Sequence, residues 1–190
     1  MKYALILWAV WYAYWIVSAR NRVRAKKDDA SVRRESVTGR VAYSAVLLAG
    51  SVLLLLNYPR GFLDRRAWTS SLASIAIGLV MEAAGMAFAI WARQTLGGNW
   101  SGRITTGGGQ ELVIRGPYRI VRHPIYSGLL LAIVGTAFVR GDIRGLVGAA
   151  LLFAGVLVKI RREEEALRQH FGPAYEAYER RVGGLLPGWH

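Results

Sequence analysis

Residues 68–91 read WTSSLASIAIGLVMEAAGMAFAIW and form the longest apolar run of the chain. A helix of this length spans about 36 Å at 1.5 Å per residue, whereas the hydrocarbon core of a bilayer is about 30 Å thick. Trp68 and Trp91 stand at its two ends, and aromatic side chains favour the membrane surface. Glu82 is its one charged residue. The run therefore predicts a membrane-spanning helix.

Shorter apolar runs lie on both sides of this segment, at residues 3–17, 41–56, 125–139 and 143–158. Each falls below the about 20 residues that a spanning helix requires, so flanking Trp, Tyr and Arg side chains must reach the membrane surface or the bilayer must thin. A soluble fold would have to bury five nearly all-apolar helices, which we disfavour. The sequence predicts an all-α, polytopic membrane protein with about five transmembrane helices. They form a single domain over residues 1–190, with three helices in residues 1–91, and a helical hairpin and tail helix in residues 92–190.

Positive charge is unevenly distributed between the loops. Nineteen of the 25 Lys and Arg residues lie in residues 20–40, 93–122 and 159–181, and six lie on the other side of the predicted helices. The positive-inside rule then places the N-terminus outside and the C-terminal region in the cytoplasm. Anionic lipid headgroups account for the excess charge, so no nucleic-acid partner is required.

The first apolar run ends in Val17-Ser18-Ala19, which resembles a signal-peptidase site. Its strongly basic flank follows the run instead of preceding it, so we favour a retained first helix over a cleaved signal peptide. The chain has no cysteine and three scattered histidines, so neither a disulfide nor a metal site is indicated.

Residues 116–128 read GPYRIVRHPIYSG. Pro124 biases the residue before it away from the helical conformation, so His123 should lie on a bend before a helix that starts near Ile125. Tyr118, Tyr126 and the backbone groups of the bend then face one place beside the membrane surface. This arrangement suits a flat ligand with polar edges.

The segment before this motif is polar and glycine-rich. Residues 103–105 and 112–114 are β-prone and lie on either side of Gly107-Gly108-Gly109, a pattern compatible with a short hairpin or with a loop. The glycine triplet is weak evidence for phosphate binding, because the Lys-Ser/Thr of a phosphate loop is missing.

The helix after the hairpin is predicted to continue beyond the membrane. Its apolar stripe has spacings of three and four residues: Val156, Ile160, Glu163, Leu167 and Phe171. Glu163 interrupts this stripe, and a partly desolvated carboxylate requires a cation, either from a ligand or from Lys159 one turn earlier. We place Glu164 on the flank of the stripe and expect Glu165 to pair with Arg161. The residues after Gly172-Pro173 are expected to dock on the bundle.

Three motifs resemble those of the isoprenylcysteine carboxyl methyltransferase family and its phospholipid N-methyltransferase relatives. They are GPYRxxRHPxYxG at 116–128, REExxLxxxFGxxYxxY at 162–178, and LGGNWS at 96–101. The resemblance covers roughly the C-terminal half and implies S-adenosyl-L-methionine as the cofactor, bound on the cytoplasmic side of a prokaryotic plasma membrane. The implied cofactor-binding residues are Leu112, Val113, Tyr118, His123, Pro124, Ile125, Tyr126, Glu163 and Glu164, with Glu163 at the amino-acid end of the cofactor.

The resemblance also implies a lipophilic or lipidated substrate that enters sideways from the bilayer. A carboxylate acceptor needs a cation to position it and no general base. In the family an arginine stands about one turn before the cofactor glutamate; here that register holds Lys159, while Arg162 lies beside Glu163. Lys159 and Arg162 are therefore the candidate catalytic residues. This departure leaves the acceptor open between an isoprenylated cysteine, a phospholipid amine and a small hydrophobic acid.

Two other functional classes are less consistent with the sequence. A membrane reductase of the sterol-reductase type needs basic residues for the phosphates of its dinucleotide, and the acidic residues 163–165 argue against it. A non-catalytic membrane or lipid-binding protein has no need of intact cofactor motifs.

Glu82 lies near the middle of the third predicted helix. A carboxyl group at that depth usually faces a bundle interior or a cavity. It either lines a substrate cavity or is protonated or hydrogen-bonded between helices, and the family resemblance assigns it no role.

The charge distribution predicts which loops an impermeant reagent can reach. Single cysteines at Ser36 and Thr105 should be shielded from an impermeant thiol reagent in intact cells, while one at Thr69 should be labelled. The opposite labelling pattern would refute the predicted orientation.

Overall fold

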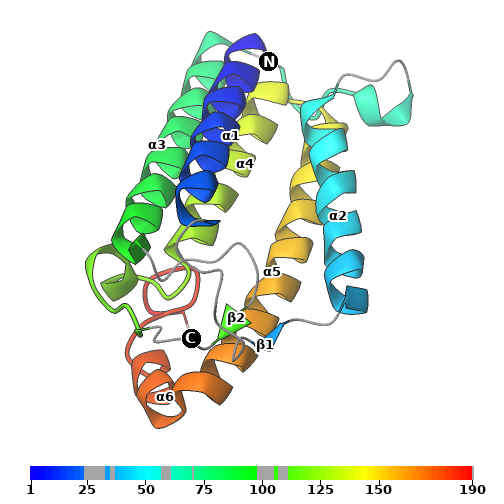
Figure 1. Cartoon of the computed structure of the whole chain (residues 1–190). Helices are drawn as coiled ribbons and strands as arrows, with labels where there is room; N and C mark the ends of the chain where they lie inside the picture. The colour runs from blue at the N-terminus through cyan, green and yellow to red at the C-terminus, as the bar shows by residue number, and fades with distance from the viewer. Residues whose placement is uncertain are drawn as a thin grey trace.

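The computed structural model describes residues 1–23, 33–34, 37–56, 61–69, 71–97, 105–106 and 111–189. Helices dominate these residues (Figure 1), which confirms the predicted helical character. The α-helices are α1 (Lys2–Val23), α2 (Val37–Leu55), α3 (Leu72–Leu96), α4 (Pro124–Arg140), α5 (Ile143–Phe171) and α6 (Pro173–Glu179). Short 3₁₀ helices, η1 (Phe62–Asp64) and η3 (Gly116–Arg119), precede α3 and α4.

A small pair of strands departs from the all-α prediction. β1 (Arg33–Arg34) and β2 (Thr105–Thr106) pair antiparallel, with Arg33 opposite Thr106. The β2 partner therefore comes from the segment between α1 and α2, and residues 112–114 are not a strand. The local hairpin interpretation is wrong because the pairing is made across the fold. The glycine triplet at 107–109 lies outside the described residues.

The number of strong membrane-spanning candidates is smaller than predicted. Among the described residues, α3 and α5 are long and apolar enough to cross a membrane, whereas about five spans were expected. The described apolar part of α2, Ser44–Leu55, and α4 are shorter. α4 has 17 residues, which cover about 26 Å, and it stops at Gly141, whose φ of 65° ends the helix.

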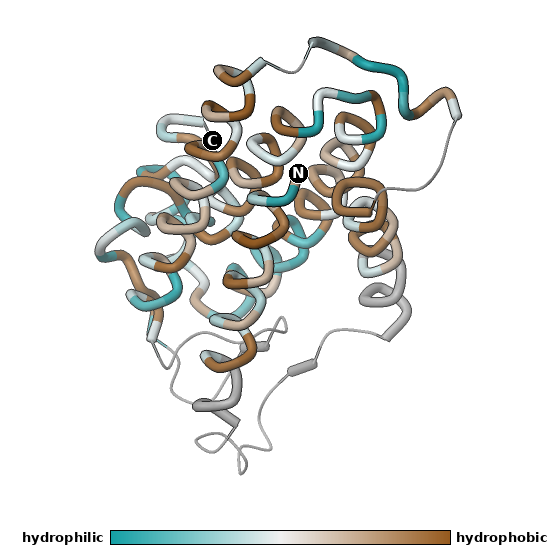
Figure 2. The backbone as a smooth tube through the Cα atoms, turned by 90° about the horizontal axis from the view of Figure 1, so that it is seen from above, coloured by the Kyte–Doolittle hydropathy of each residue, from teal (hydrophilic) through white to brown (hydrophobic). Residues whose placement is uncertain are grey.

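The helices pack as two groups that α4 and α5 join. α3 and α4 are antiparallel with α1 beside them, and α2 packs along α5. The predicted hairpin of α4 and α5 is present, with its tip at Gly141-Asp142. Figure 1 shows the N-terminus at the hairpin-tip end and α6 at the opposite end. Figure 2 shows that hydrophobic residues predominate along the helices.

Glycines bring the backbones of α3 and α4 into direct contact. A Cβ atom at Gly78 would lie 2.6 Å from the carbonyl oxygen of Gly135, and one at Gly135 would lie 2.6 Å from the amide nitrogen of Glu82. Gly85 and Gly128 oppose each other in the same way one heptad further on, where a Cβ on either would overlap the carbonyl oxygen of the other. Small residues at such positions permit close helix approach inside a membrane. This contact sets the position of α4 along the axis of α3.

Gly85→Ala should therefore destabilise the protein by about 1–3 kcal/mol, because the methyl group forces the two helix backbones apart. The matched control is Gly61→Ala, where a Cβ meets nothing within 4 Å. Thermal unfolding in detergent measures both variants. Equal melting temperatures would show that the helix contact does not depend on the missing Cβ.

Candidate functional site

The bend between η3 and α4 has the predicted form. Pro117 lies in the first turn of η3, and Pro124 is the first residue of α4. His123 precedes that helix in a non-helical conformation, with φ −121° and ψ 57°. A proline at the first helical position loses no intrahelical bond, because that N–H has no partner in the helix. His123 and its neighbours are thus presented at the α6 end of the bundle.

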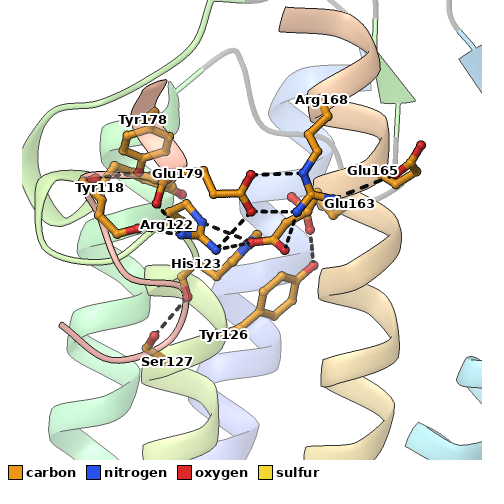
Figure 3. Close-up of polar contacts among 12 residues, drawn as sticks. Tyr118, Arg122, His123, Tyr126, Ser127, Glu163, Glu165, Arg168, Tyr178 and Glu179 are labelled. Atoms are coloured by element: carbon orange, nitrogen blue, oxygen red, sulfur yellow. Dashed lines mark hydrogen bonds and ion pairs between the residues drawn. The ribbon is translucent and has the colours of Figure 1, made fainter. Parts of the chain in front are cut away.

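Glu164 of α5 contacts Arg122, His123 and Arg168, three residues that Figure 3 labels. Its Oε1 atom accepts hydrogen bonds from Arg122 Nη2 at 2.8 Å and Arg122 Nε at 3.1 Å, and lies 3.0 Å from His123 Nε2. Arg168 Nη2 lies 3.6 Å from its other oxygen. Glu164 is 9% exposed. Burial by itself raises the pKa of this carboxyl group, but hydrogen bonds from His123 and Arg122 and their charges outweigh it and lower the pKa to about 2.

Arg122 also fastens the chain after α6 to the bend. Its Nη1 donates to the carbonyl oxygens of Glu179 at 3.1 Å and Val182 at 2.6 Å. The amide nitrogens of Arg122 and His123 donate to the carbonyl oxygens of Gly183 and Gly184. The predicted docking of the tail is confirmed by these bonds.

Further contacts hold the tail along its length. Arg168 pairs with Glu179 at 2.6 Å, and the Tyr178 hydroxyl donates to the carbonyl oxygen of Tyr118 at 2.6 Å. Ser127 donates to the carbonyl oxygen of Leu185 at 2.7 Å. The tail therefore covers the start of α4 and shields the side chains of the bend from solvent.

Glu163 has a different environment from its neighbour. Its side chain is half-buried and accepts one hydrogen bond within the described part of the chain, from the Tyr126 hydroxyl at 2.8 Å. Lys159 does not pair with it; instead the Lys159 ammonium lies over the Tyr126 ring, 5.5 Å from its centroid. Arg162 is half-buried on the same helix.

The predicted orientation of the two glutamates on α5 is wrong. The buried stripe of α5 runs through every fourth residue, Gly148, Leu152, Val156, Ile160 and Glu164, so Glu164 faces the bundle and Glu163 stands beside it. Leu167 and Phe171 are only half-buried. The bend packs on the Glu164 side and supplies the Arg122 cation and the His123 ring, which make the burial of Glu164 possible. Glu165 is exposed and lies near Arg168 and Gln169, so the expected pair with Arg161 is not formed.

The remaining predicted site residues lie on the approach to the bend or at its start. Tyr118 and Pro124 are buried, and Ile125 is half-buried. Leu112 and Val113 are half-buried in the extended segment before η3. Figure 3 places Tyr118, His123, Tyr126 and Glu163 around one group of contacts.

Glu82 does not belong to this group. It is 0% exposed, and neither of its carboxyl oxygens has a hydrogen-bond partner among the described residues. Its side chain faces Thr136, which is 12 residues beyond Pro124 on α4 and so about 18 Å along the helix from the bend. It therefore does not line an open cavity here. The hydroxyl of Thr136 accepts a hydrogen bond from Trp8 of α1 at 2.9 Å.

Sequence reasoning missed the structural importance of Arg122, Arg168 and Glu179. Arg122 is part of the quoted motif, and its position next to His123 in that motif was the one available signal. Its partner Glu164 is 42 residues away, and no local pattern indicates which of three adjacent glutamates it meets.

Comparison with known proteins shows the family of this chain. The sequence profile described as phospholipid methyltransferase matches residues 73–174, which include the bend and most of the α5 motif. The chain belongs to the phospholipid methyltransferase family. The family resemblance inferred from the motifs is thus confirmed.

Individual relatives extend the comparison. A probable protein-S-isoprenylcysteine O-methyltransferase of Oryza sativa subsp. indica is 36% identical over 114 residues, or 58% of this chain and 60% of that protein. The chain thus matches less than two thirds of that relative's length. The uncharacterized protein YpbQ of Bacillus subtilis is 27% identical over 81% of this chain and 88% of its own length. The structure of the eukaryotic intramembrane Ras methyltransferase ICMT matches with a TM-score of 0.52 and 23% identity, over 80% of this chain and 51% of that one, which shows a shared fold.

The Glu164 contacts predict an acid-sensitive contribution to stability. Because the pKa of Glu164 lies below its ordinary value of 4.5, its stabilisation is present above about pH 4.5 and is lost as the pH falls toward 2. Glu164→Gln should cost about 3 kcal/mol at neutral pH, since it removes the nearest counter-charge of the buried Arg122 and leaves only Glu179, at 3.6 Å. The stability cost of Glu164→Gln should shrink as the pH falls from about 4.5 toward 2, because the wild-type carboxylate then becomes protonated.

Thermal unfolding of wild type, Glu164→Gln and the exposed control Glu165→Gln between pH 7 and pH 2.5 measures this effect. The control should remain within about 0.5 kcal/mol of wild type. A stability loss that is the same for both variants, or that does not depend on pH, would contradict the assigned role of Glu164.

Proposed function

We propose that this chain is an S-adenosyl-L-methionine-dependent methyltransferase that works in a membrane and methylates a carboxylate on a lipophilic acceptor. Family membership, the rice relative's name as an O-methyltransferase and the shared fold with a methyltransferase structure support this proposal. The observation that carries it is that Glu163 has no cationic partner among the described residues and can therefore pair with a cation of the ligand.

Three adjacent glutamates differ in what holds them. Glu164 is paired with Arg122 and lies against His123, and Glu165 is exposed beside Arg168. Glu163 is half-buried and is bound by a neutral hydroxyl, so its negative charge is not balanced by a protein cation within the described residues. A semi-buried carboxylate of this kind is suited to receive the ammonium group of an amino-acid ligand.

The residues of the bend fit the rest of such a ligand. Tyr118, His123, Pro124, Ile125 and Tyr126, with Leu112 and Val113 before them, would surround its nucleoside portion. His123 is held by Glu164, so Glu164 acts on the ligand through His123 and Arg122 and not by direct contact. When bound, S-adenosyl-L-methionine supplies a methyl group on a sulfonium sulfur, which a carboxylate oxygen takes while the sulfur keeps the electron pair of the broken C–S bond.

The acceptor carboxylate would be oriented by cations on α5. Lys159 follows directly after the apolar run that ends at Val158, so it lies where an acceptor from the bilayer reaches the polar end of the bundle. Lys159 and Arg162 then hold the anion near Glu163, and alignment and exclusion of water supply the main catalytic effect.

The acceptor enters sideways from the bilayer and the cofactor enters from the cytoplasm. Among the described residues, α3 and α5 are the helices long and apolar enough to hold the site at the membrane. The positive-inside rule then places the N-terminus outside and the C-terminal region inside. The positive excess on the inner side fits anionic lipids of a prokaryotic plasma membrane.

A phospholipid amine acceptor is the alternative that the family's description favours. An amine must lose a proton before it attacks, which requires a base near the acceptor. His123 is buried, and its Nε2 atom lies against Glu164, so it is poorly placed for that task. A reductase remains disfavoured, because Arg122 and Arg168 are engaged by Glu164 and Glu179 and do not offer a phosphate site.

Cofactor binding tests whether Glu163 pairs with the ammonium group of the ligand. Glu163→Gln should weaken the binding of S-adenosyl-L-methionine by about tenfold to a hundredfold, because it removes a charge-assisted hydrogen bond worth about 1.5–3 kcal/mol. The matched control Glu165→Gln removes an exposed charge two residues away and should change affinity by less than about threefold.

Calorimetry in detergent or nanodiscs measures both affinities, with thermal melts to check folding. Equal affinities in the two variants would remove Glu163 from the cofactor site. No binding to the wild-type protein at millimolar ligand would refute the proposed function itself.

A further inference from the structure

Tyr126 contacts two of the three charged side chains that the proposed function uses, Glu163 and Lys159. It lies in the first turn of α4, and its hydroxyl donates to Glu163. The Lys159 ammonium lies over its ring. Lys159 and Glu163 are four residues apart on α5, a spacing at which they can pair directly. In the structure they do not form that pair, and each meets Tyr126 instead (Figure 3 shows the hydroxyl contact).

Both contacts are of a kind that a charged ligand can replace. A phenol donates one hydrogen bond to a carboxylate, whereas an ammonium offers hydrogen bonds and a full positive charge. A cation over an aromatic ring is held by about 0.5–1 kcal/mol at a partly exposed site, less than a carboxylate can offer it. By contrast, Glu164 and Arg122 hold each other at 2.8 Å in a buried setting.

We propose that Tyr126 is a positioning residue that couples the two binding sites, so that filling the cofactor site releases Lys159 for the acceptor. The inference rests on the proposed function. A ligand ammonium at Glu163 displaces the Tyr126 hydroxyl. The ring keeps its packing against His123 but loses the bond that sets its position over Lys159. It then gives up its contact with Lys159, and the ammonium becomes available to an acceptor carboxylate.

The coupling predicts an unusual effect of Tyr126→Phe. The variant keeps the ring and removes the hydroxyl that competes for Glu163, so S-adenosylhomocysteine, which carries the same ammonium, should bind about threefold to tenfold more tightly. 5′-Methylthioadenosine lacks the amino-acid end and should bind with unchanged affinity. Tyr3→Phe, at an exposed position of α1, is the matched control and should alter neither affinity.

Calorimetry separates the possible outcomes. Weaker binding of S-adenosylhomocysteine to Tyr126→Phe would mean that the hydroxyl contacts the ligand directly, and it would overturn the coupling. Unchanged affinity would leave Tyr126 as a structural brace and would also overturn it. Binding that fails even in the wild-type protein would refute the proposed function and this inference with it.

A second measurement needs no variant. Lys159 acylation by acetic anhydride, followed by mass spectrometry, reports whether its amine is held by the ring. Saturating S-adenosylhomocysteine should raise the Lys159 labelling rate by about threefold, and 5′-methylthioadenosine should not. Lys2, at the opposite end of the bundle, is the internal control. If S-adenosylhomocysteine binds and the Lys159 rate stays constant, the two sites are not coupled and the proposed function still stands.

Discussion

A buried carboxylate must be balanced by cations, and at Glu164 this requirement joins three distant parts of the chain. Arg122 and His123 approach it from the bend before α4, and Arg168 approaches from the next turn of α5. Arg122 then uses its remaining donors on the carbonyl groups of the tail. An isolated charge would be expelled from such a place, so the bend, the helix and the tail are stable only in one another's presence. The candidate site depends on this interaction.

The glycine contacts between α3 and α4 make that arrangement possible. The two backbones are in contact where Gly78 meets Gly135 and where Gly85 meets Gly128. These contacts oppose a shift of α4 along the axis of α3. The start of α4 is therefore held at a set height near the end of α3. The bend can then reach α5 at the turn that carries Glu163 and Glu164.

The adjacent glutamates show how one helical step separates a structural role from a proposed binding role. Glu164 continues the buried ridge of every fourth residue and is neutralised by protein cations. Glu163 is turned by about 100° from it and reaches only the Tyr126 hydroxyl among the described residues. A ligand ammonium can replace a hydroxyl far more readily than it can displace an arginine that donates two hydrogen bonds to one carboxylate oxygen.

The sequence by itself determined the features that depend on neighbouring residues. The apolar runs predicted the helices, the proline at 124 predicted the bend at His123, and the spaced motifs indicated the family. Only the tertiary structure decided that Glu164 is the buried glutamate, that β2 pairs with β1, and that Tyr126 stands between Lys159 and Glu163. Proline sterics and hydrophobic periodicity act over a few residues and can be read from the chain. The partner of a charge 42 residues away depends on how far each helix is rotated and how closely the helices approach, and the packing of the whole bundle sets both.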